Sequence, residues 1–149
     1  MPLVEGITYV HEHTTIDLSS LKKTDDTNLN CFDETIVEYK ELYKKGVRNI
    51  IDVTVMGMNR NPDYVKRVGE LSGMNIIQST GWYQDKFIPS YVDNHTVEEM
   101  AEVMVQDITV GIDGTDSRAE LIGEIATSKD QMTERERKVF EAAVIAHNQ

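Results

Sequence analysis

Two histidines near the start of the chain have the residue type and spacing of a metal site. His11 and His13 are separated by one residue and follow the strand-like run Gly6–Val10. Because alternate side chains of a strand share a face, the two imidazoles point the same way, about 7 Å apart along the chain. This spacing suits a divalent ion such as Zn²⁺, which accepts neutral imidazole nitrogen. Histidines at this spacing also occur by chance, so a pair of polar strand-end side chains stays the alternative.

A carboxylate far along the chain supplies a third donor of the right kind. Glu124 lies in the apolar run LIGEIA at 121–126. Burying a carboxylate there is costly unless a cation or hydrogen-bond donors satisfy it. Two imidazoles and one carboxylate form the three-ligand set of catalytic zinc, which leaves a position for water whose acidity the metal raises. The alternative is a salt-bridged glutamate at a strand end.

Composition narrows the class of protein and of partner. The chain has 149 residues, the length of one domain, and its 15 basic against 26 acidic residues give a net charge of -11. Repulsion disfavours nucleic acid and anionic membranes as partners and leaves small-molecule substrates open. Cys31 is the only cysteine, the start lacks signal-peptide features, and no apolar run approaches the roughly 18 residues of a membrane span. We therefore expect a cytoplasmic protein.

Hydrophobic periodicity and capping residues predict four strands that alternate with four helices. Thr96 with Glu99 and Thr133 with Glu136 have the spacing of capping boxes. The predicted strands are 6–10, 47–54, 75–80 and 119–126, and the predicted helices run from Phe32 to Gly46, Asn61 to Gly73, Thr96 to Gly111 or Gly114, and Thr133 to Gln149. Residues 14–31 are predicted to form a loop over the end of the first strand.

Strict alternation of strands and helices predicts parallel strands and the α/β class. No glycine-rich dinucleotide or P-loop motif is present, which removes the main support for nucleotide binding. The alternatives are an open four-stranded layer and part of a (β/α)8 barrel. In both, ligand sites gather at the C-terminal ends of the strands. His11, His13, Trp82, Tyr83 and Glu124 all lie at or after such ends.

Five sequence blocks, taken together and in order, resemble the phosphotriesterase family of the amidohydrolase superfamily, and most closely its phosphotriesterase homology proteins. They are GITYVHEH at 6–13, TGWYQD at 80–85, GIDGT at 111–115, LIGEIATS at 121–128 and FEAAVIAHNQ at 140–149. The resemblance runs in register over essentially the whole chain. Five blocks in order are far more specific than two spaced histidines.

The resemblance implies a binuclear metal hydrolase on a TIM barrel, which cleaves ester, lactone or phosphoester bonds of small molecules with a metal-activated hydroxide. By this likeness, His11 and His13 bind the more buried metal, expected to be zinc, and Glu124 bridges both ions where many relatives have a carboxylated lysine. Tyr83 would lie over the metals and contact substrate, with Trp82 as a second choice. For both aromatic residues, packing in the core or in a lid is the alternative.

The family barrel has eight strands, so residues 1–149 are expected to form its N-terminal half, (β/α)4, as a single domain. Relatives take two further metal-binding histidines and an aspartate from the other half, so no catalytic acid or base is assigned here. His95 and His147 lie away from strand ends, and we expect them to be surface or packing residues. Glu12 alternates with the histidines and is expected to face the helices.

Half a barrel leaves two unpaired strand edges and an uncovered apolar layer. We expect a homodimer or higher oligomer to cover them through an obligate interface, and the competing expectation is a shortened product that is unstable alone. Three functions remain open: a metal-dependent hydrolase, a catalytically inactive half-barrel that at most binds metal and self-associates, and a structural fragment that needs a partner chain.

Overall fold

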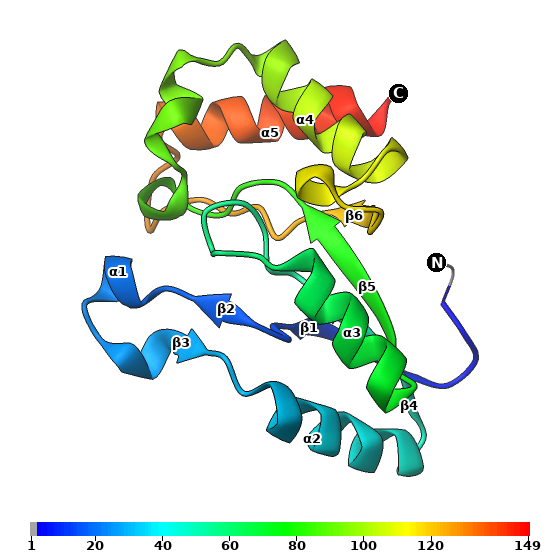
Figure 1. Ribbon diagram of the computed structural model, residues 1–149. Coiled ribbons are helices and arrows are strands. Elements are labelled where there is room, and N and C mark those ends of the chain that lie inside the picture. The colour runs from blue at the N-terminus through cyan, green and yellow to red at the C-terminus, as the bar shows by residue number, and fades with distance from the viewer. Residues whose placement is uncertain (1–2) are drawn as a thin grey trace.

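A computed structural model describes residues 3–149 of the protein. Its main sheet has four strands in the order β1 (Ile7–Glu12), β4 (Val47–Asp52), β5 (Asn75–Thr80) and β6 (Ala119–Ile122). Each strand pairs in parallel with the next one in this order. Figure 1 shows the helices between the strands on the outer side of the sheet. The predicted α/β class with parallel strands is confirmed.

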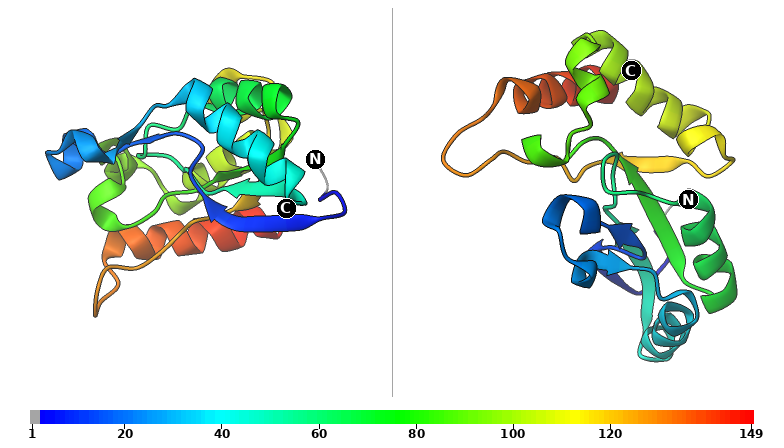
Figure 2. Two further views of the ribbon diagram at one scale, coloured as in Figure 1. Left: turned by 90° about the horizontal axis from the view of Figure 1, so that it is seen from below. Right: turned by 60° about the vertical axis from the view of Figure 1, so that its left-hand side comes forward.

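Four long helices lie where hydrophobic spacing predicts them. They are α2 (Phe32–Lys44), α3 (Pro62–Ser72), α4 (Val97–Thr109) and α5 (Glu134–His147). Both predicted capping boxes form, at Thr96 with Glu99 and at Thr133 with Glu136. The two further views in Figure 2 show α2, α3 and α4 following one another around the sheet. We call this side of the sheet the helix side and the opposite face the open side.

The predicted loop at 14–31 is wrong in part, because this segment contains short regular elements. The strands β2 (Ile16–Asp17) and β3 (Asn28–Leu29) pair antiparallel and enclose the helix α1 (Ser19–Lys22) and the 3₁₀ turn η1 (Asp25–Thr27). Strands of two residues are too short to show a hydrophobic alternation in the sequence. Further 3₁₀ turns are η2 (Asp85–Phe87), η3 (Ser90–Asn94) and η4 (Ile112–Gly114).

The last strand of the sheet is shorter than predicted, because β6 ends at Ile122 and not at Ala126. Gly123 has a φ of +136°, a conformation that favours glycine, and its N–H donates to the carbonyl of Thr80 at 2.8 Å. The chain therefore leaves the strand before Glu124, which lies in the loop that follows β6.

Two hydrophobic clusters fill the helix side of the sheet. One lies under α2 and α3 and includes Ile36, Ile50 and Val68, and the other lies under α4 and α5 and includes Trp82 and Met100. Burial of these side chains supplies the main stabilisation of the fold, at about 25 cal/mol per Å² of apolar surface. No helix of residues 3–149 is both long enough and apolar enough to cross a bilayer.

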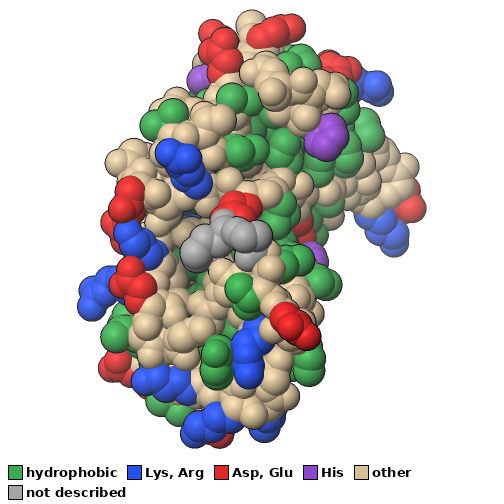
Figure 3. Space-filling view, turned by 90° about the vertical axis from the view of Figure 1, so that its right-hand side faces the viewer, with side chains coloured by type: hydrophobic (Ala, Val, Ile, Leu, Met, Phe, Trp, Pro, Cys, Tyr) green, Lys and Arg blue, Asp and Glu red, His purple; other side chains and the backbone are tan. Residues whose placement is uncertain are grey.

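Apolar side chains remain exposed at both edges of the sheet. On β1, Ile7 is 53% and Val10 is 66% exposed. At the other edge, β6 and α5 form an apolar groove lined by Leu121, Phe140 and Val144, among others. Figure 3 shows hydrophobic side chains gathered around one histidine on the upper part of the face in view. The two edges are therefore surfaces that a partner can cover.

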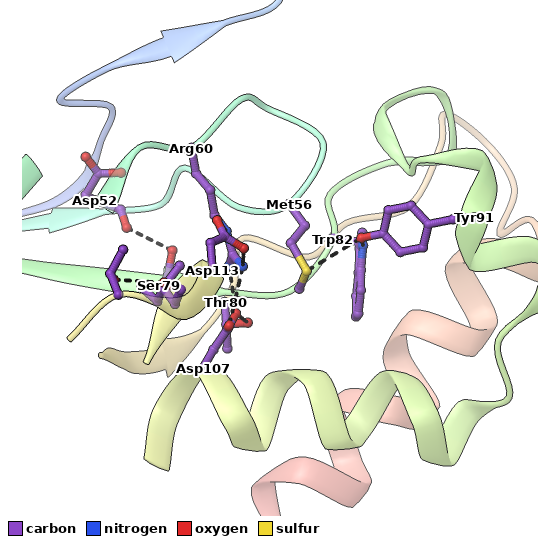
Figure 4. Close-up of polar contacts among 11 residues, drawn as sticks. Asp52, Met56, Arg60, Ser79, Thr80, Trp82, Tyr91, Asp107 and Asp113 are labelled. Carbon is purple, nitrogen blue, oxygen red and sulfur yellow. Dashed lines mark hydrogen bonds and ion pairs between the residues drawn. The ribbon is translucent and has the colours of Figure 1, made fainter. Parts of the chain in front are cut away.

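A buried arginine links three segments near the C-terminal end of the sheet (Figure 4). Arg60, in the loop after β4, donates to Asp107 of α4 at 2.7 Å and to Asp113 of η4 at 2.6 Å. Thr80 at the end of β5 donates to the same Asp107 at 2.6 Å. The side chains of Arg60 and Asp107 are only 8% and 5% exposed. Asp107 is thus a buried carboxylate whose charge is compensated by Arg60.

A buried glutamate links the start of α5 to two loops. Glu136 is fully buried and accepts hydrogen bonds from the N–H groups of Thr133 and Asp85 and from the hydroxyl of Ser128. Burial by itself raises the pKa of Glu136, but the hydrogen bonds from Ser128, Thr133 and Asp85 outweigh it and lower the pKa to about 2. The carboxylate is therefore ionised at neutral pH.

Replacement of Arg60 by Met is expected to lower the free energy of unfolding by about 3–5 kcal/mol, because Asp107 is left buried without its cation. Adding Asp107→Asn removes the uncompensated charge and keeps an acceptor for Thr80, so the double variant should be more stable than Arg60→Met alone. Urea unfolding measures both effects. Lys66→Met, which breaks the exposed pair with Asp116, is the control and should change stability by about 0.5 kcal/mol or less. Strictly additive effects of the two substitutions would contradict the coupling.

Glu136→Ala is expected to lower the free energy of unfolding by roughly 3 kcal/mol at neutral pH, because it leaves buried donors unpaired. Since the pKa of Glu136 lies at about 2 in the folded chain against an ordinary 4.5, its contribution is complete above pH 4.5 and is lost as the pH falls through about 2. Denaturation of both proteins across this range should show their difference shrinking. Glu134→Ala, at a side chain that is 81% exposed in the same helical turn, should behave like the wild type.

Candidate metal centre

The three donors predicted from sequence converge at the C-terminal end of the sheet. Nε2 of His11 lies 3.2 Å from Oε2 of Glu124, and Nε2 of His13 lies 3.8 Å from Oε1 of the same carboxylate. One ligand atom from each residue lies within 4.8 Å of those of the other two. The imidazole rings are 6.1 Å apart between centroids and nearly perpendicular. Donors at the two ends of the sequence are thus placed around one point.

A register shift in β1 sets the direction of the histidines. Tyr9 pairs with Ile50 and Glu12 pairs with Asp52, so three steps along β1 match two steps along β4. Ile50 packs in the cluster under α2, which places its neighbour Tyr9 on the helix side. Such a bulge changes the phase of the alternation and re-aims the residues after it.

Glu12 therefore also lies on the helix side, although it is three positions after Tyr9 and strict alternation would place it on the opposite face. Burial raises the pKa of Tyr39 on α2 to about 12, and the negative charges of Asp52 and Glu12 add to this shift. The neighbours of Glu12, His11 and His13, then face the open side and Glu124. Glu12 lies toward the helices, as its alternation with the histidines predicts.

The three side chains differ in exposure. His11 is 61% exposed, His13 is 27% exposed and Glu124 is 17% exposed. Nδ1 of His13 lies 2.9 Å from the hydroxyl of Thr54, in the loop after β4. Among residues 3–149, the ion-pair partners of Glu124 are these two histidines. A partly buried carboxylate that faces two imidazole nitrogens has the donor chemistry of a divalent cation site.

The two aromatic residues after β5 occupy different environments. Trp82 is 1% exposed, packs in the cluster under α4 and α5, and donates from Nε1 to the hydroxyl of Tyr91 at 3.4 Å (Figure 4). Its position corresponds to the packing alternative. Tyr83 is partly exposed, and its pKa is raised by burial and by the charge of Glu124. Tyr83 is therefore the aromatic residue that is electrostatically coupled to the site.

The remaining histidines lie apart from this cluster. His95 contacts the backbone carbonyl of Tyr91 through Nδ1 at 2.9 Å, and His147 is exposed in the last turn of α5. In the described part of the chain, the three predicted donors form the only group of three or more histidine, cysteine and acidic side chains with metal-binding spacing.

Two residues that support the site were missed in the sequence. Asp52 is buried, and its carboxylate accepts the N–H of Thr14 at 2.8 Å and the N–H of Thr54 at 2.9 Å. Its backbone carbonyl accepts from Ser79 (Figure 4). A carboxylate inside the run Ile50–Val53 was a signal of the same kind as Glu124. Thr54 carries no comparable signal, since a threonine is ordinary at the end of a strand.

Comparison with known proteins gives a consistent result. The family model described as the phosphotriesterase family matches residues 2–149. The phosphotriesterase homology protein of Escherichia coli is 43% identical over 144 residues, which cover 97% of this chain and 49% of that protein. An aryldialkylphosphatase of Saccharolobus solfataricus is 31% identical and is matched over 97% of this chain and 46% of its own length. The chain spans about half the length of these relatives.

Solved structures agree with this assignment. The crystal structure of the Escherichia coli homology protein, with phosphate in its active site, superposes with a TM-score of 0.95 over 97% of this chain and 50% of that one. A lactonase from Listeria monocytogenes, 20% identical, supports the fold alone, with a TM-score of 0.88 over 96% of this chain and 49% of its own. The parallel βα units therefore correspond to half of a TIM barrel, and the chain belongs to the phosphotriesterase family.

Proposed function

We propose that residues 1–149 form the N-terminal half of a metal-dependent hydrolase that cleaves ester, lactone or phosphoester bonds of small molecules. The observation that carries the proposal is the convergence of His11, His13 and Glu124 at the C-terminal end of a parallel sheet. Ligand sites of this architecture lie at that end. The names of the relatives, an aryldialkylphosphatase and a lactonase among them, support hydrolysis as the type of reaction.

Zinc is the metal that this donor set fits best, with two imidazole nitrogens and one carboxylate. When bound, such an ion polarises a carbonyl or phosphoryl oxygen and lowers the pKa of a bound water to supply a hydroxide nucleophile. The chain itself provides the ligands and fixes their directions. Glu124 directs one carboxylate oxygen toward each histidine, so the three side chains would hold the ion together.

Tyr83 is the proposed substrate contact. A phenol is protonated at neutral pH, and burial and the charge of Glu124 raise the pKa of Tyr83 further, so its hydroxyl can donate a hydrogen bond. A donor next to the metal ligands suits an oxygen of the substrate on which negative charge develops. Trp82 is not included in this role, because its ring is buried in the core.

The second proposal is a catalytically inactive half-barrel that at most binds metal and self-associates or needs a partner chain. The exposed apolar residues of β1 and the apolar groove beside β6 favour it, because both edges of the sheet are uncovered. A second copy is the partner that we propose. A homodimer through these edges would bury apolar surface on both chains.

Removal of the ligands tests the metal site. His11→Ala and Glu124→Gln are each expected to reduce the zinc content of the purified chain from about one equivalent to near none, because zinc sites lacking one of three protein ligands bind weakly. Elemental analysis after dialysis measures this. His95→Ala is the matched control and should retain zinc. Unchanged zinc in the His11 and Glu124 variants would contradict the ligand assignment.

The zinc-loaded wild-type chain also serves to test whether hydrolysis occurs. Hydrolysis of a lactone and a phosphotriester panel by the zinc-loaded chain, lost on chelation, is expected from the first proposal. Zinc binding without turnover on this panel would support the inactive half-barrel instead.

Val10→Asp tests the proposed dimer. A carboxylate at this exposed position of β1 would be buried in an apolar interface, so the dissociation constant of the dimer should rise at least about tenfold. Leu71→Asp is the control: it places the same charge at an exposed position of α3, away from both sheet edges, and should leave the dissociation constant of the dimer unchanged. Light scattering coupled to gel filtration measures both. A stable monomer of the wild-type chain would contradict self-association.

A further inference from the structure

We propose that Thr54 is a positioning residue that fixes the ring orientation and the tautomer of His13, so that its Nε2 is the atom free to bind a cation. The inference deepens the proposed function, because it assigns a supporting residue to the same metal site. It rests on one chain of hydrogen bonds at the C-terminal ends of β1 and β4.

The hydroxyl of Thr54 has only one proton, which we assign to the contact whose partner can only accept. Thr54 Oγ1 donates to the carbonyl of Thr15 at 3.2 Å, an acceptor that has no proton of its own. Its oxygen is also 2.9 Å from Nδ1 of His13. Because the hydroxyl proton is already used, the oxygen accepts at this second contact and His13 donates from Nδ1–H. In the neutral ring, Nε2 is then the nitrogen without a proton.

This tautomer places a lone pair on the side of the ring that faces the other donors. Nε2 of His13 lies 3.8 Å from Oε1 of Glu124. A nitrogen lone pair and a carboxylate directed at each other favour a cation between them. Metal-binding histidines in proteins usually donate their second ring N–H to a neighbouring acceptor, which fixes the ring and its tautomer.

Thr54 is itself held rigidly, which a positioning residue requires. Thr54 is only 5% exposed, and its backbone N–H donates to Oδ1 of Asp52 at 2.9 Å. Oδ2 of Asp52 accepts the N–H of Thr14, the residue that follows His13. One buried carboxylate therefore fixes the backbone next to the histidine and the backbone of its hydrogen-bond partner.

The tautomer can be measured without any metal. In the metal-free chain at alkaline pH, where imidazoles are neutral, two-bond ¹H–¹⁵N correlation spectra are expected to show His13 protonated at Nδ1. Resonances are assigned with the His13→Gln variant. In the Thr54→Val variant this pattern should be lost or mixed with the Nε2–H form. A wild-type spectrum with His13 protonated at Nε2 would overturn the inference, whether or not the chain binds zinc.

Zinc affinity supplies the second measurement, by competition with a chromophoric chelator. Thr54→Val is expected to weaken zinc binding roughly 10- to 100-fold, the usual effect of removing an outer hydrogen-bond partner of a metal ligand. Thr54→Ser keeps the hydroxyl and should bind zinc nearly as well as the wild type. Thr80→Val removes a buried hydroxyl on the helix side and controls for stability loss, with zinc affinity unchanged.

The tautomer spectra and the zinc affinities together distinguish failure of this inference from failure of the proposed function. Wild-type affinity in Thr54→Val, or equally weak binding by the Ser and Val variants, would overturn the role of Thr54. A wild-type chain that takes up no zinc would overturn the metal site, while the spectra would still decide the tautomer.

Discussion

The change of register between β1 and β4 is the constraint on which the site depends. A strand alternates its side chains strictly, so without the shift Tyr9, His11 and His13 would all lie on one side of the sheet. Tyr9 pairs with Ile50, whose side chain lies on the helix side in the cluster under α2 and α3. One extra residue in β1 places Tyr9 and the two histidines on opposite faces of the sheet. It allows an aromatic residue to face the helices and the histidines to face Glu124.

Buried carboxylates form the second part of the design, because they join the loops at the C-terminal end of the sheet to one another and to the helices. Asp52 holds the loops after β1 and β4, Asp107 connects α4 to β5 and to Arg60, and Glu136 connects α5 to the loops after β5 and β6. Each is compensated by several donors, which is the condition under which a buried charge does not destabilise a fold. The C-terminal end of the sheet is therefore ordered by hydrogen bonds to buried carboxylates together with buried apolar side chains such as Val55 and Trp82.

Much of this arrangement could be predicted from the sequence, for physical reasons. Long amphipathic helices such as α4 have a clear apolar period and a capping box, and β-branched runs such as 47–52 identify the parallel strands. The donors were recognisable because a histidine pair and a carboxylate in an apolar run are chemically unusual. The bulge in β1, the early end of β6 and the partner of His13 depend on pairing between distant segments, which local patterns do not encode. Trp82 and Tyr83 are adjacent in sequence, and only the packing of α4 and α5 decides which of them is buried.

The order of the main sheet follows the order of its strands along the chain, since β4, β5 and β6 each pair with the preceding strand of that sheet. Each pairing in the main sheet is therefore made across a single crossover and does not wait for a later strand of that sheet. During synthesis on the ribosome, each new strand would emerge next to a partner that is already available, so the N-terminal pair can form before the residues of α5 have been translated.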